Sequence, residues 1–421
     1  RQKIADNTHA LAAANENLTA VQQEAKSLAE QNGEAGQQLV SIRAQQALLQ
    51  SQSASVTAQI ASMEASMEEV LARRQTLEED RTAAKTRQEQ IAAQQVQALL
   101  ADYLSRAYVD EYFSAKAKAD VEEMIGEFIA IYKERILAQD WMSAETKKKA
   151  QEKLATFHVK IGYPDKWRDY SNLEIKNDSY WDNIVRSNHF DYDKMIAKAG
   201  KPVDKDEWLM TPQTVNAYYN PTTNEICFPA AILQYPFFDM NADDACNYGA
   251  IGVVIGHEMT HGFDDQGRQY DKDGNLKDWW TSEDAKNFKE RAQVLVDYFN
   301  KIEVLPGLMA NGELTLGENI ADHGGLQVAY LALQKAMTEN PLGKDENGFT
   351  PEQRFFLSYG NVWAGNIRDE QIRLQTKSDP HSLGRWRVNA ALPHISMWYD
   401  AFGVKEGDAL YLPVEKRASI W

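Results

Sequence analysis

The chain has 421 residues, a formal net charge of −17 at pH 7, and 43% hydrophobic residues. A chain of this length can form more than one domain and bury a substantial core. Its acidic balance argues against nucleic acid or an anionic membrane surface as a partner, because both attract basic patches. No run of about 18 apolar residues occurs, so no transmembrane helix is expected. The two cysteines, Cys227 and Cys246, are too few for a disulfide framework and could form one disulfide or remain free thiols.

The first hundred residues differ from the rest, since the first aromatic residue is Tyr103 and the first proline is Pro164. An apolar residue recurs at every seventh position of this segment: Ala14, Val21, Leu28, Ala35, Ile42, Leu49, Val56, Met63, Val70, Leu77, Ala84, Ile91 and Ala98. A second series turns polar further along after its early members Leu11, Leu18, Ala25, Asn32 and Leu39. One sustained seam predicts a long helix or coiled coil over residues 1–100, with residues 31–36 as the one candidate for a hairpin turn. Such a segment would serve self-association or spacing; the alternative is a partly disordered, helix-prone tail.

Residues 101–214 are predicted to form a helical scaffold. Apolar residues follow a helical spacing over 103–139, and Ser143 is placed to cap a second helix over 144–157. Further along, residues 215–219 and 225–228 predict two short strands around a turn at 220–223. Nothing in 101–214 indicates catalysis, so we assign the chemistry to residues 215–421.

The segment His257-Glu258-Met259-Thr260-His261 has the spacing of a metal-binding helix. Residues four apart share one face of a helix, so both imidazoles can bind one metal ion, while Glu258 can reach a water molecule on that ion. The small residues before this motif predict that the helix packs closely on a neighbour: Gly249, Gly252 and Gly256.

A catalytic zinc site usually has three protein ligands and one open position, so a third ligand must come from elsewhere. Glu318 is the best candidate, because it opens a second helical pattern. Asp322 lies four residues later on the same face and can accept the second N–H of a zinc-bound histidine. A helix-start carboxylate favoured by the helix dipole is the alternative for Glu318, but its pairing with the histidine motif favours a ligand. The sequence therefore predicts one Zn²⁺ per chain.

Residues from about 105 to 421 resemble the neprilysin and endothelin-converting-enzyme family of zinc endopeptidases, including bacterial endopeptidase O-like enzymes. The matching motifs occur in the family's order: Asn216-Ala217-Tyr218-Tyr219, Phe228-Pro229-Ala230, Pro236-Phe237-Phe238, residues 256–265, residues 317–322, His381-Ser382 and Arg387-Val388-Asn389. The resemblance implies a mainly α fold with a small β part and a zincin-like, thermolysin-like catalytic domain over 215–421. Residues 101–214 would be a remnant of the family's cap domain and linker, while the long coiled-coil segment of 1–100 does not match.

The resemblance implies the same three metal ligands, with Glu258 as the general base and Asp322 as the residue that orients a histidine. It also implies that His381 stabilises the oxyanion, although His381 taken alone is a histidine in a loop. Leu383 stands where the family usually has proline after His-Ser. The chain ends Ala418-Ser419-Ile420-Trp421 in place of the Cys-x-x-Trp of the animal enzymes, so their disulfide is not expected here.

The resemblance also implies how a peptide is bound. Arg387 would hold a substrate carbonyl on the primed side, and Asn216 and Ala217 would bind the peptide as an added strand. The pocket for the hydrophobic residue after the cut bond would be lined by Phe237, Val254, Val362 and Trp363.

We therefore predict a zinc-dependent endopeptidase that hydrolyses oligopeptides on the N-terminal side of hydrophobic residues, with water activated by Glu258 at the zinc. The alternative is a catalytically impaired peptidase-fold scaffold with a coiled-coil interaction segment. A calcium loop at residues 271–275 is disfavoured, because its glycine comes too early for an EF-hand. The family is mostly extracytoplasmic, so we expect a periplasmic or secreted protein, with the cytoplasm as the alternative.

Overall fold

The computed structural model describes residues 2–31 and 33–421, and the chain divides into two compact units, Arg1–Gln95 and Val96–Trp421. The division lies close to the change in composition near residue 100. The further boundary between residues 214 and 215 stays a prediction. Strand pairing links its two sides, because β1 (His158–Gly162) lies beside β3 (Glu225–Pro229) in one sheet.

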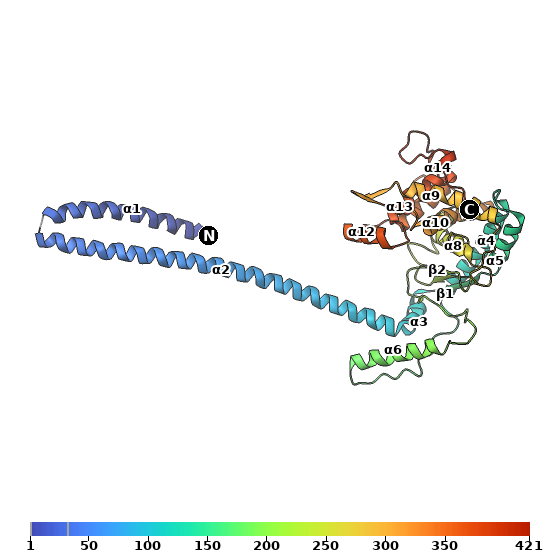
Figure 1. The fold of residues 1–421 in the computed structure, drawn as a ribbon, viewed down its shortest axis with the longest axis horizontal. Helices are drawn as coiled ribbons and strands as arrows, with labels where there is room; N and C mark the ends of the chain where they lie inside the picture. Colours follow the sequence, from blue (N-terminus) through green and yellow to red (C-terminus); the bar gives the residue numbers. More distant parts are fainter. Residues whose placement is uncertain (1, 32) are drawn as a thin grey trace. The chain divides into compact units, whose positions relative to one another are not determined.

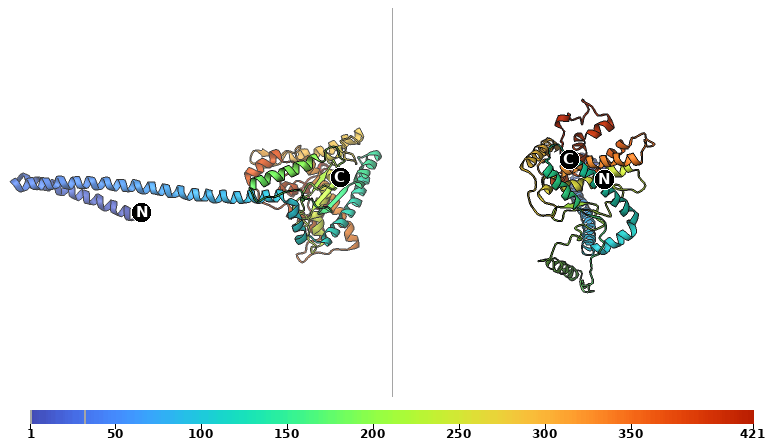
Figure 2. Two further views of the ribbon diagram at one scale, coloured as in Figure 1. Left: turned by 90° about the horizontal axis from the view of Figure 1, so that it is seen from below. Right: turned by 90° about the vertical axis from the view of Figure 1, so that its right-hand side faces the viewer.

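The first unit consists of helix α1 (Gln2–Gln31) and of helix α2 (Gly33–Leu99) as far as Gln95, and α1 lies along the first part of α2 (Figures 1 and 2). The predicted turn at 31–36 lies partly outside the described residues, since it includes Asn32. Gly33 has a positive φ of 57°, a conformation that favours glycine. The partly or fully covered side chains of α1 recur at intervals of four and three: Leu11, Asn15, Leu18, Gln22 and Ala25. Three of these, Leu11, Leu18 and Ala25, belong to the second apolar series, so its members on α1 pack within the unit, whereas Leu39 on α2 is 41% exposed.

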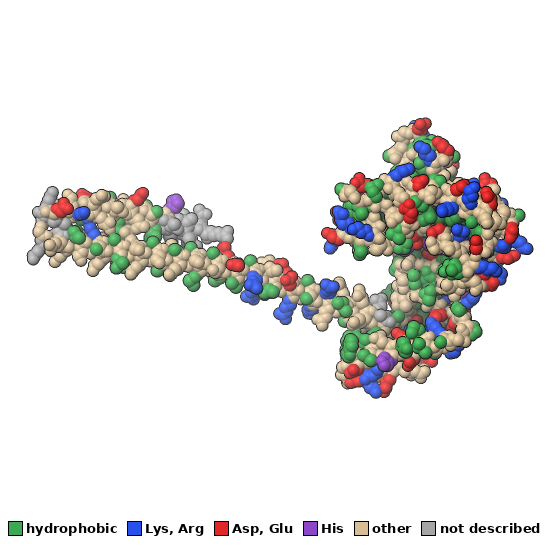
Figure 3. Space-filling view, viewed as in Figure 1, with side chains coloured by type: hydrophobic (Ala, Val, Ile, Leu, Met, Phe, Trp, Pro, Cys, Tyr) green, Lys and Arg blue, Asp and Glu red, His purple; other side chains and the backbone are tan. Residues whose placement is uncertain are grey.

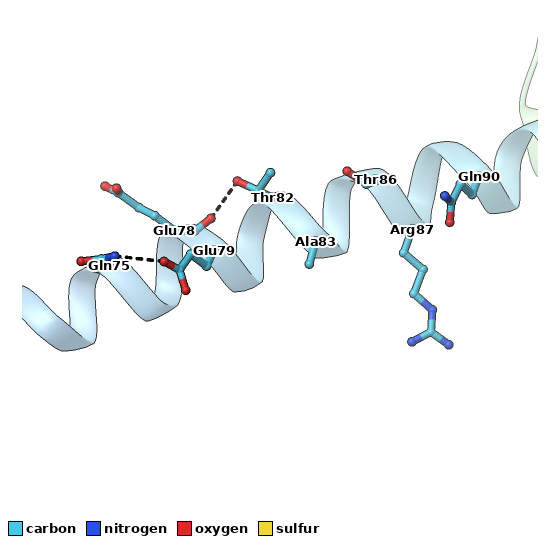
Figure 4. A pocket seen from close by; sticks show the side chains of 8 residues that line it. All are labelled: Gln75, Glu78, Glu79, Thr82, Ala83, Thr86, Arg87 and Gln90. Carbon is cyan, nitrogen blue, oxygen red and sulfur yellow. Dashed lines mark hydrogen bonds between the residues drawn. The ribbon is translucent and has the colours of Figure 1, made fainter. Parts of the chain in front are cut away.

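The sustained apolar seam is exposed instead. Its large described members are each 46% to 72% exposed: Val21, Leu28, Ile42, Leu49, Val56, Met63, Val70, Leu77 and Ile91. Hydrophobic side chains are correspondingly visible on the surface of this helical segment (Figure 3). A shallow groove on α2 between Gln75 and Gln90 is formed by one helix alone, with Gln75 bonded to Glu79 and Thr82 to the Glu78 carbonyl (Figure 4). Because one helix surface encloses nothing, we assign no function to this groove.

The second unit begins with three helices that form its scaffold: α3 (Ala101–Tyr112), α4 (Ala115–Ala138) and α5 (Ala144–Ala155). Ser143 caps α5 by accepting a hydrogen bond from the Thr146 N–H, as its position predicts. The apolar face of α4 is buried in the core, including Val121, Phe128 and Ile136, which are fully covered. The helix α6 (Tyr180–Ile196) follows in a more open stretch.

A three-stranded sheet lies next to the metal-binding helix. Its order is β1-β3-β2, with β3 parallel to β1 and antiparallel to β2 (Tyr218–Asn220). The two predicted strands are thus present, and β2 is an edge strand that follows directly on Asn216 and Ala217. Cys227 in β3 and Cys246 are both free thiols, so the question of a disulfide is resolved in favour of two thiols.

The remaining elements are mainly helical: α7 (Asp244–Asn247), η1 (Tyr248–Gly252), α8 (Val253–His261), η2 (Gly267–Gln269), α9 (Ser282–Phe299), β4 (Glu303–Leu305), β5 (Leu308–Met309), α10 (Leu316–Glu339), α11 (Pro351–Val362), α12 (Asp369–Ser378), α13 (Gly384–Asn389), η3 (Leu392–His394), α14 (Ser396–Phe402) and η4 (Val414–Lys416). Figure 1 shows α8 and α10 inside the second unit, surrounded by its other helices. The prediction of a mainly α fold with a small β part is confirmed.

Close packing of α8 on α10 determines where the site lies. A Cβ on Gly256 would lie 2.8 Å from the Gly325 Cα, and a Cβ on Gly325 would lie 2.7 Å from the His257 N. Real Cβ atoms do not approach backbone this closely, so only glycines allow this helix crossing. Of the three glycines predicted to pack closely on a neighbour, Gly256 packs on α10, Gly249 on the Phe355 backbone of α11 and Gly252 on the Phe128 ring of α4. The close approach at Gly256 lets side chains of α10 reach those of α8.

The end of the chain is buried behind the same helices. Trp421 is 1% exposed and packs among aromatic rings that include Tyr132 and Phe263. The Ala418 carbonyl lies 3.1 Å from the His323 Nε2, and the Ala418 N–H donates to the His394 Nδ1 at 2.9 Å. Aromatic packing and these two bonds hold the terminus without the disulfide of the animal enzymes.

Candidate metal centre and active site

Two histidines of α8 and a glutamate of α10 form a cluster that could hold a metal ion. One ligand atom each from His257, His261 and Glu318 lie within 4.8 Å of one another. The two Nε2 atoms are 3.0 Å apart, and the Glu318 carboxylate oxygens lie 3.3 Å from the His257 Nε2 and 3.5 Å from the His261 Nε2. Ligand atoms at tetrahedral corners, each about 2 Å from zinc, are separated by about 3.3 Å. The three groups therefore fit one zinc ion with a fourth position open.

Both histidines are oriented by carboxylates on the side away from the cluster. The His257 Nδ1 donates to the Asp322 Oδ1 at 2.9 Å, and the His261 Nδ1 donates to the Asp264 Oδ2 at 2.7 Å. A carboxylate only accepts, so each imidazole carries a proton on Nδ1, and Nε2 is the ring nitrogen that remains for a metal ion. The role expected for Asp322 has this geometric support, and Asp264 supplies the same contact to the second histidine.

Arg387 lies deep in the site and holds Asp322 in place. Its Nε and Nη2 donate to the two carboxylate oxygens of Asp322 at 2.8 and 2.6 Å, and Nη2 is 3.6 Å from Glu318. Its guanidinium also lies 4.0 Å from the ring centre of Trp363. Burial disfavours the charge, but Asp322 and Glu318 outweigh burial and raise the pKa of Arg387 further above its usual value.

The site carries an excess of negative charge that suits a divalent cation. Burial opposes a charged His257, but hydrogen bonds and charges from Asp322 and Glu318 outweigh it and raise its pKa to about 10. The Glu318 Oε2 is buried, and its described neighbours, the His257 Nε2 at 3.3 Å and the Arg387 Nη2 at 3.6 Å, make no well-aligned hydrogen bond to it. A buried carboxylate oxygen without a well-aligned hydrogen bond is costly unless something else occupies its lone pairs. A cation between the two Nε2 atoms and Glu318 would do so, and it would displace protons from the histidines on binding.

Glu258 and His381 face the same cavity, which is about 530 Å³ in volume. Glu258 is 6% exposed, and burial raises the pKa of its carboxyl against the opposing charges of His257 and His261. The His381 Nδ1 donates to the Asp379 Oδ1 at 2.7 Å, and its Nε2 lies 3.3 Å from the Glu318 Oε1. Asp379 thereby turns the Nε2 of His381 toward the metal cluster.

All thirteen residues singled out in the sequence line this one cavity: Asn216, Ala217, Phe237, Val254, His257, Glu258, His261, Glu318, Asp322, Val362, Trp363, His381 and Arg387. They come from the segments before β2 and before α7, from helices α8, α10 and α13, from the end of α11, and from the loop between α12 and α13 that carries His381. The Ala217 N–H donates to the Asn216 side chain at 2.9 Å, so a peptide pairing there would replace this local contact.

Two carboxylates of the site were missed by sequence reasoning. Asp264 follows His261 by three residues, and Asp379 precedes His381 by two, so each is a near neighbour of the histidine that it orients. The signal was present in this spacing, but short loop spacing does not reveal which way a side chain points.

Comparison with known proteins identifies the class of this site. Models of peptidase family M13 match residues 216–418 and, for the family's N-terminal part, residues 25–164. The second match includes residues 25–100, so the prediction that the first hundred residues do not match the family is wrong for this part of the chain. A solved structure of the Mycobacterium tuberculosis zinc metalloprotease Zmp1 in complex with an inhibitor is 44% identical and superposes with a TM-score of 0.74, over 77% of this chain and 50% of that one. The fold is therefore the zincin-like fold of these metalloproteases.

The chain belongs to peptidase family M13, the family of neprilysin and endothelin-converting enzyme. It is 41% identical to a Locusta migratoria endothelin-converting enzyme homolog over 323 residues, which are 75% of this chain and 44% of that protein. It is 39% identical to human neprilysin over 330 residues, which are 76% of this chain and 44% of that protein. The chain thus spans less than half the length of these curated relatives.

Proposed function

We propose that this chain is a zinc-dependent endopeptidase that hydrolyses oligopeptides on the N-terminal side of hydrophobic residues. The observation that carries the proposal is the metal cluster itself: two histidines oriented by carboxylates and one buried glutamate, with Glu258 facing the same cavity. Membership of the metallopeptidase family M13 supports the same activity.

In this proposal His257, His261 and Glu318 hold one zinc ion, and Asp322 and Asp264 keep the two imidazoles in the required tautomer. Zinc at this position would polarise the scissile carbonyl and lower the pKa of water. Glu258 takes the proton from the attacking water and passes it to the leaving amine nitrogen. Its place next to a ligand on the same helix supports this role, because the motif brings it beside the centre without occupying a ligand position.

With a proton on each ring nitrogen, His381 donates from Nδ1 to Asp379 and from Nε2 to the carbonyl oxygen as that oxygen gains negative charge. The contact of its Nδ1 with Asp379 supports this role, because Asp379 fixes the donor before the substrate arrives. One donor of this kind contributes about 3 kcal/mol to transition-state stabilisation. Arg387 sits beside Asp322 and Trp363 and offers positive charge to a substrate carbonyl on the primed side.

The peptide would bind along the edge strand β2, with its backbone bonded to Asn216 and Ala217. The side chain after the scissile bond would enter the pocket lined by Phe237, Val254, Val362 and Trp363. These apolar walls exclude a charged side chain, because burying an unpaired charge is costly.

The proposed activity is tested with quenched fluorescent peptides that carry Phe or Leu after the scissile bond. We expect cleavage that a zinc chelator abolishes and added zinc restores, and at least tenfold slower cleavage when Asp replaces the hydrophobic residue. Mass spectrometry of the products would locate the cut. Failure to cleave with stoichiometric zinc bound would contradict the proposal and favour an impaired peptidase-fold scaffold.

We further propose that the first unit mediates self-association through the exposed seam of α2. A second copy fits this surface, because a seven-residue apolar repeat sustained over many turns is the pattern that pairs identical helices. Replacing Val56 and Val70 by glutamate is expected to convert a self-associated protein to monomers by light scattering. The control replaces exposed Arg74 and Lys85 of the same helix by glutamine. A wild-type protein that is monomeric at tens of micromolar would refute this proposal.

None of the described helices is both long and apolar enough to cross a membrane. We propose an extracytoplasmic location, periplasmic or secreted, in line with the similarity to the mostly extracytoplasmic neprilysin family. Fractionation of the source cells tests it, and recovery with cytosolic markers would overturn it.

A further inference from the structure

Lys153 of α5 is buried directly behind the metal site. It is 1% exposed, and its Nζ donates to three backbone carbonyls, Gly262 and Gly267 at 2.7 Å and Tyr270 at 2.8 Å. An ammonium group has three donors, so its hydrogen bonding is complete. All three acceptors belong to the loop that runs from the end of α8 through η2.

This loop carries the carboxylate that orients a metal ligand. Asp264 accepts hydrogen bonds at Oδ1 from the N–H groups of Gln266 and Gly267, at 2.9 and 2.6 Å, and holds His261 at Oδ2. Gly267 therefore bonds Asp264 through its N–H and Lys153 through its carbonyl. Gly262 follows His261 directly, so the ammonium secures the loop on both sides of Asp264.

Lys153 also connects the loop with the strand side of the cavity. Its ammonium lies 5.7 Å from the ring centres of Tyr219 in β2 and Phe263 in the loop, and 5.9 Å from that of Trp279. Its own carbonyl accepts from the Asn224 side chain at 3.0 Å, in the turn between β2 and β3. The side chain and the backbone carbonyl of Lys153 together thus contact both structures that border the metal site.

We propose that Lys153 is a positioning residue for the metal site, which holds the 262–270 loop so that Asp264 orients the His261 imidazole. The inference rests on the proposed metal site but not on peptide hydrolysis. Without the ammonium, the buried Gly262 carbonyl loses its hydrogen-bond donor, while the carbonyls of Gly267 and Tyr270 keep one donor each, the Tyr270 N–H at 3.1 Å and the Trp279 indole N–H at 2.9 Å. The 262–270 loop then loses its hydrogen bonds to α5, and it must move for the Gly262 carbonyl to reach water. Orienting contacts of this kind typically change metal affinity by about 10- to 100-fold when they are lost.

The test is the zinc affinity of Lys153→Met, measured by chelator competition, together with the d–d absorption spectrum after cobalt substitution. We expect at least a tenfold weaker affinity and an altered spectrum, since the spectrum reports the geometry of the ligands. If the methionine variant does not fold, Lys153→Gln keeps a shorter hydrogen-bond donor and is expected to show a smaller loss of affinity. Wild-type affinity and spectrum in either folded variant would overturn the inference.

Two comparisons separate positioning from general stability. Leu154→Ala removes a side chain that is 2% exposed from the same helix and should lower the melting temperature without changing zinc affinity. In the double variant with Asp264→Ala, the Lys153→Met change should add little further loss of affinity, because both act through one contact. If the loss of zinc affinity in the double variant equals the product of the losses in the two single variants, the inference is overturned. A wild-type protein that binds no zinc would instead refute the proposed function, so the two failures are distinguishable.

Discussion

Replacing Glu258 by glutamine is expected to abolish peptide hydrolysis while the protein keeps its zinc. Glutamine has nearly the same shape but cannot take a proton from water, and the loss of a general base typically costs about 10²- to 10⁴-fold in rate. Glu258 is not one of the three clustered ligand groups, so the metal site should remain intact. Turnover of a fluorescent peptide measures the expected loss of hydrolysis, and atomic absorption measures the zinc that the variant is expected to keep.

Glu318→Gln is the matched control, since it makes the same chemical change in the same cavity. Glu318 is in the metal cluster and carries a buried oxygen without a well-aligned hydrogen bond from the described residues. We expect Glu318→Gln to bind zinc more weakly, so that its loss of turnover follows from the loss of the metal ion and not from the loss of a general base. Near-normal turnover in Glu258→Gln would show that another group is the base.

Replacing Gly325 by alanine is expected to damage both the fold and the metal site. The added Cβ would lie 2.7 Å from the His257 N and 2.7 Å from the Val253 carbonyl, both backbone atoms of α8. A helix backbone cannot rotate away as a side chain can, so α8 and α10 must separate. Overpacking of this kind costs about 1–3 kcal/mol or more. Because the ligands lie on these two helices, zinc affinity should fall as well, which chelator competition and thermal melting would measure.

Gly126→Ala in α4 is the control for the same substitution where space is available. A Cβ at Gly126 would meet nothing within 4 Å, and the residue is exposed. Alanine is the better helix former by about 0.5–1 kcal/mol, so this variant should melt at the wild-type temperature or slightly above it. Equal stability and zinc affinity in Gly325→Ala and Gly126→Ala would contradict the role assigned to the helix crossing.

Which of the two apolar series in the first unit is covered by a neighbouring helix depended on tertiary structure. Both apolar series were visible in the sequence, and the sustained one was the stronger signal for a helix. The structure covers Leu18 and Ala25 of the shorter series and leaves Val56 and Val70 exposed. Periodicity shows that a helix has an apolar face, but the position of the chain reversal decides which face another helix reaches.

The sequence by itself determined the chemistry of the site. The spacing of His257, Glu258 and His261 requires a helix that presents two imidazoles to one ion, and Glu318 and Asp322 repeat that logic on a second helix. These predictions needed only local periodicity, because each pair lies within one turn of its own helix.

Only the tertiary structure decided what holds that chemistry in place. Lys153 lies about a hundred residues before the metal-binding helix and resembles the half-buried and exposed lysines before it in the sequence, yet it is buried against three carbonyls of the loop. Asp264 and Asp379 stood beside histidines in the sequence, but the direction of their side chains depends on loop conformation. Contacts between distant segments have no periodic signature, so they become visible only when the packed helices and loops bring the residues together.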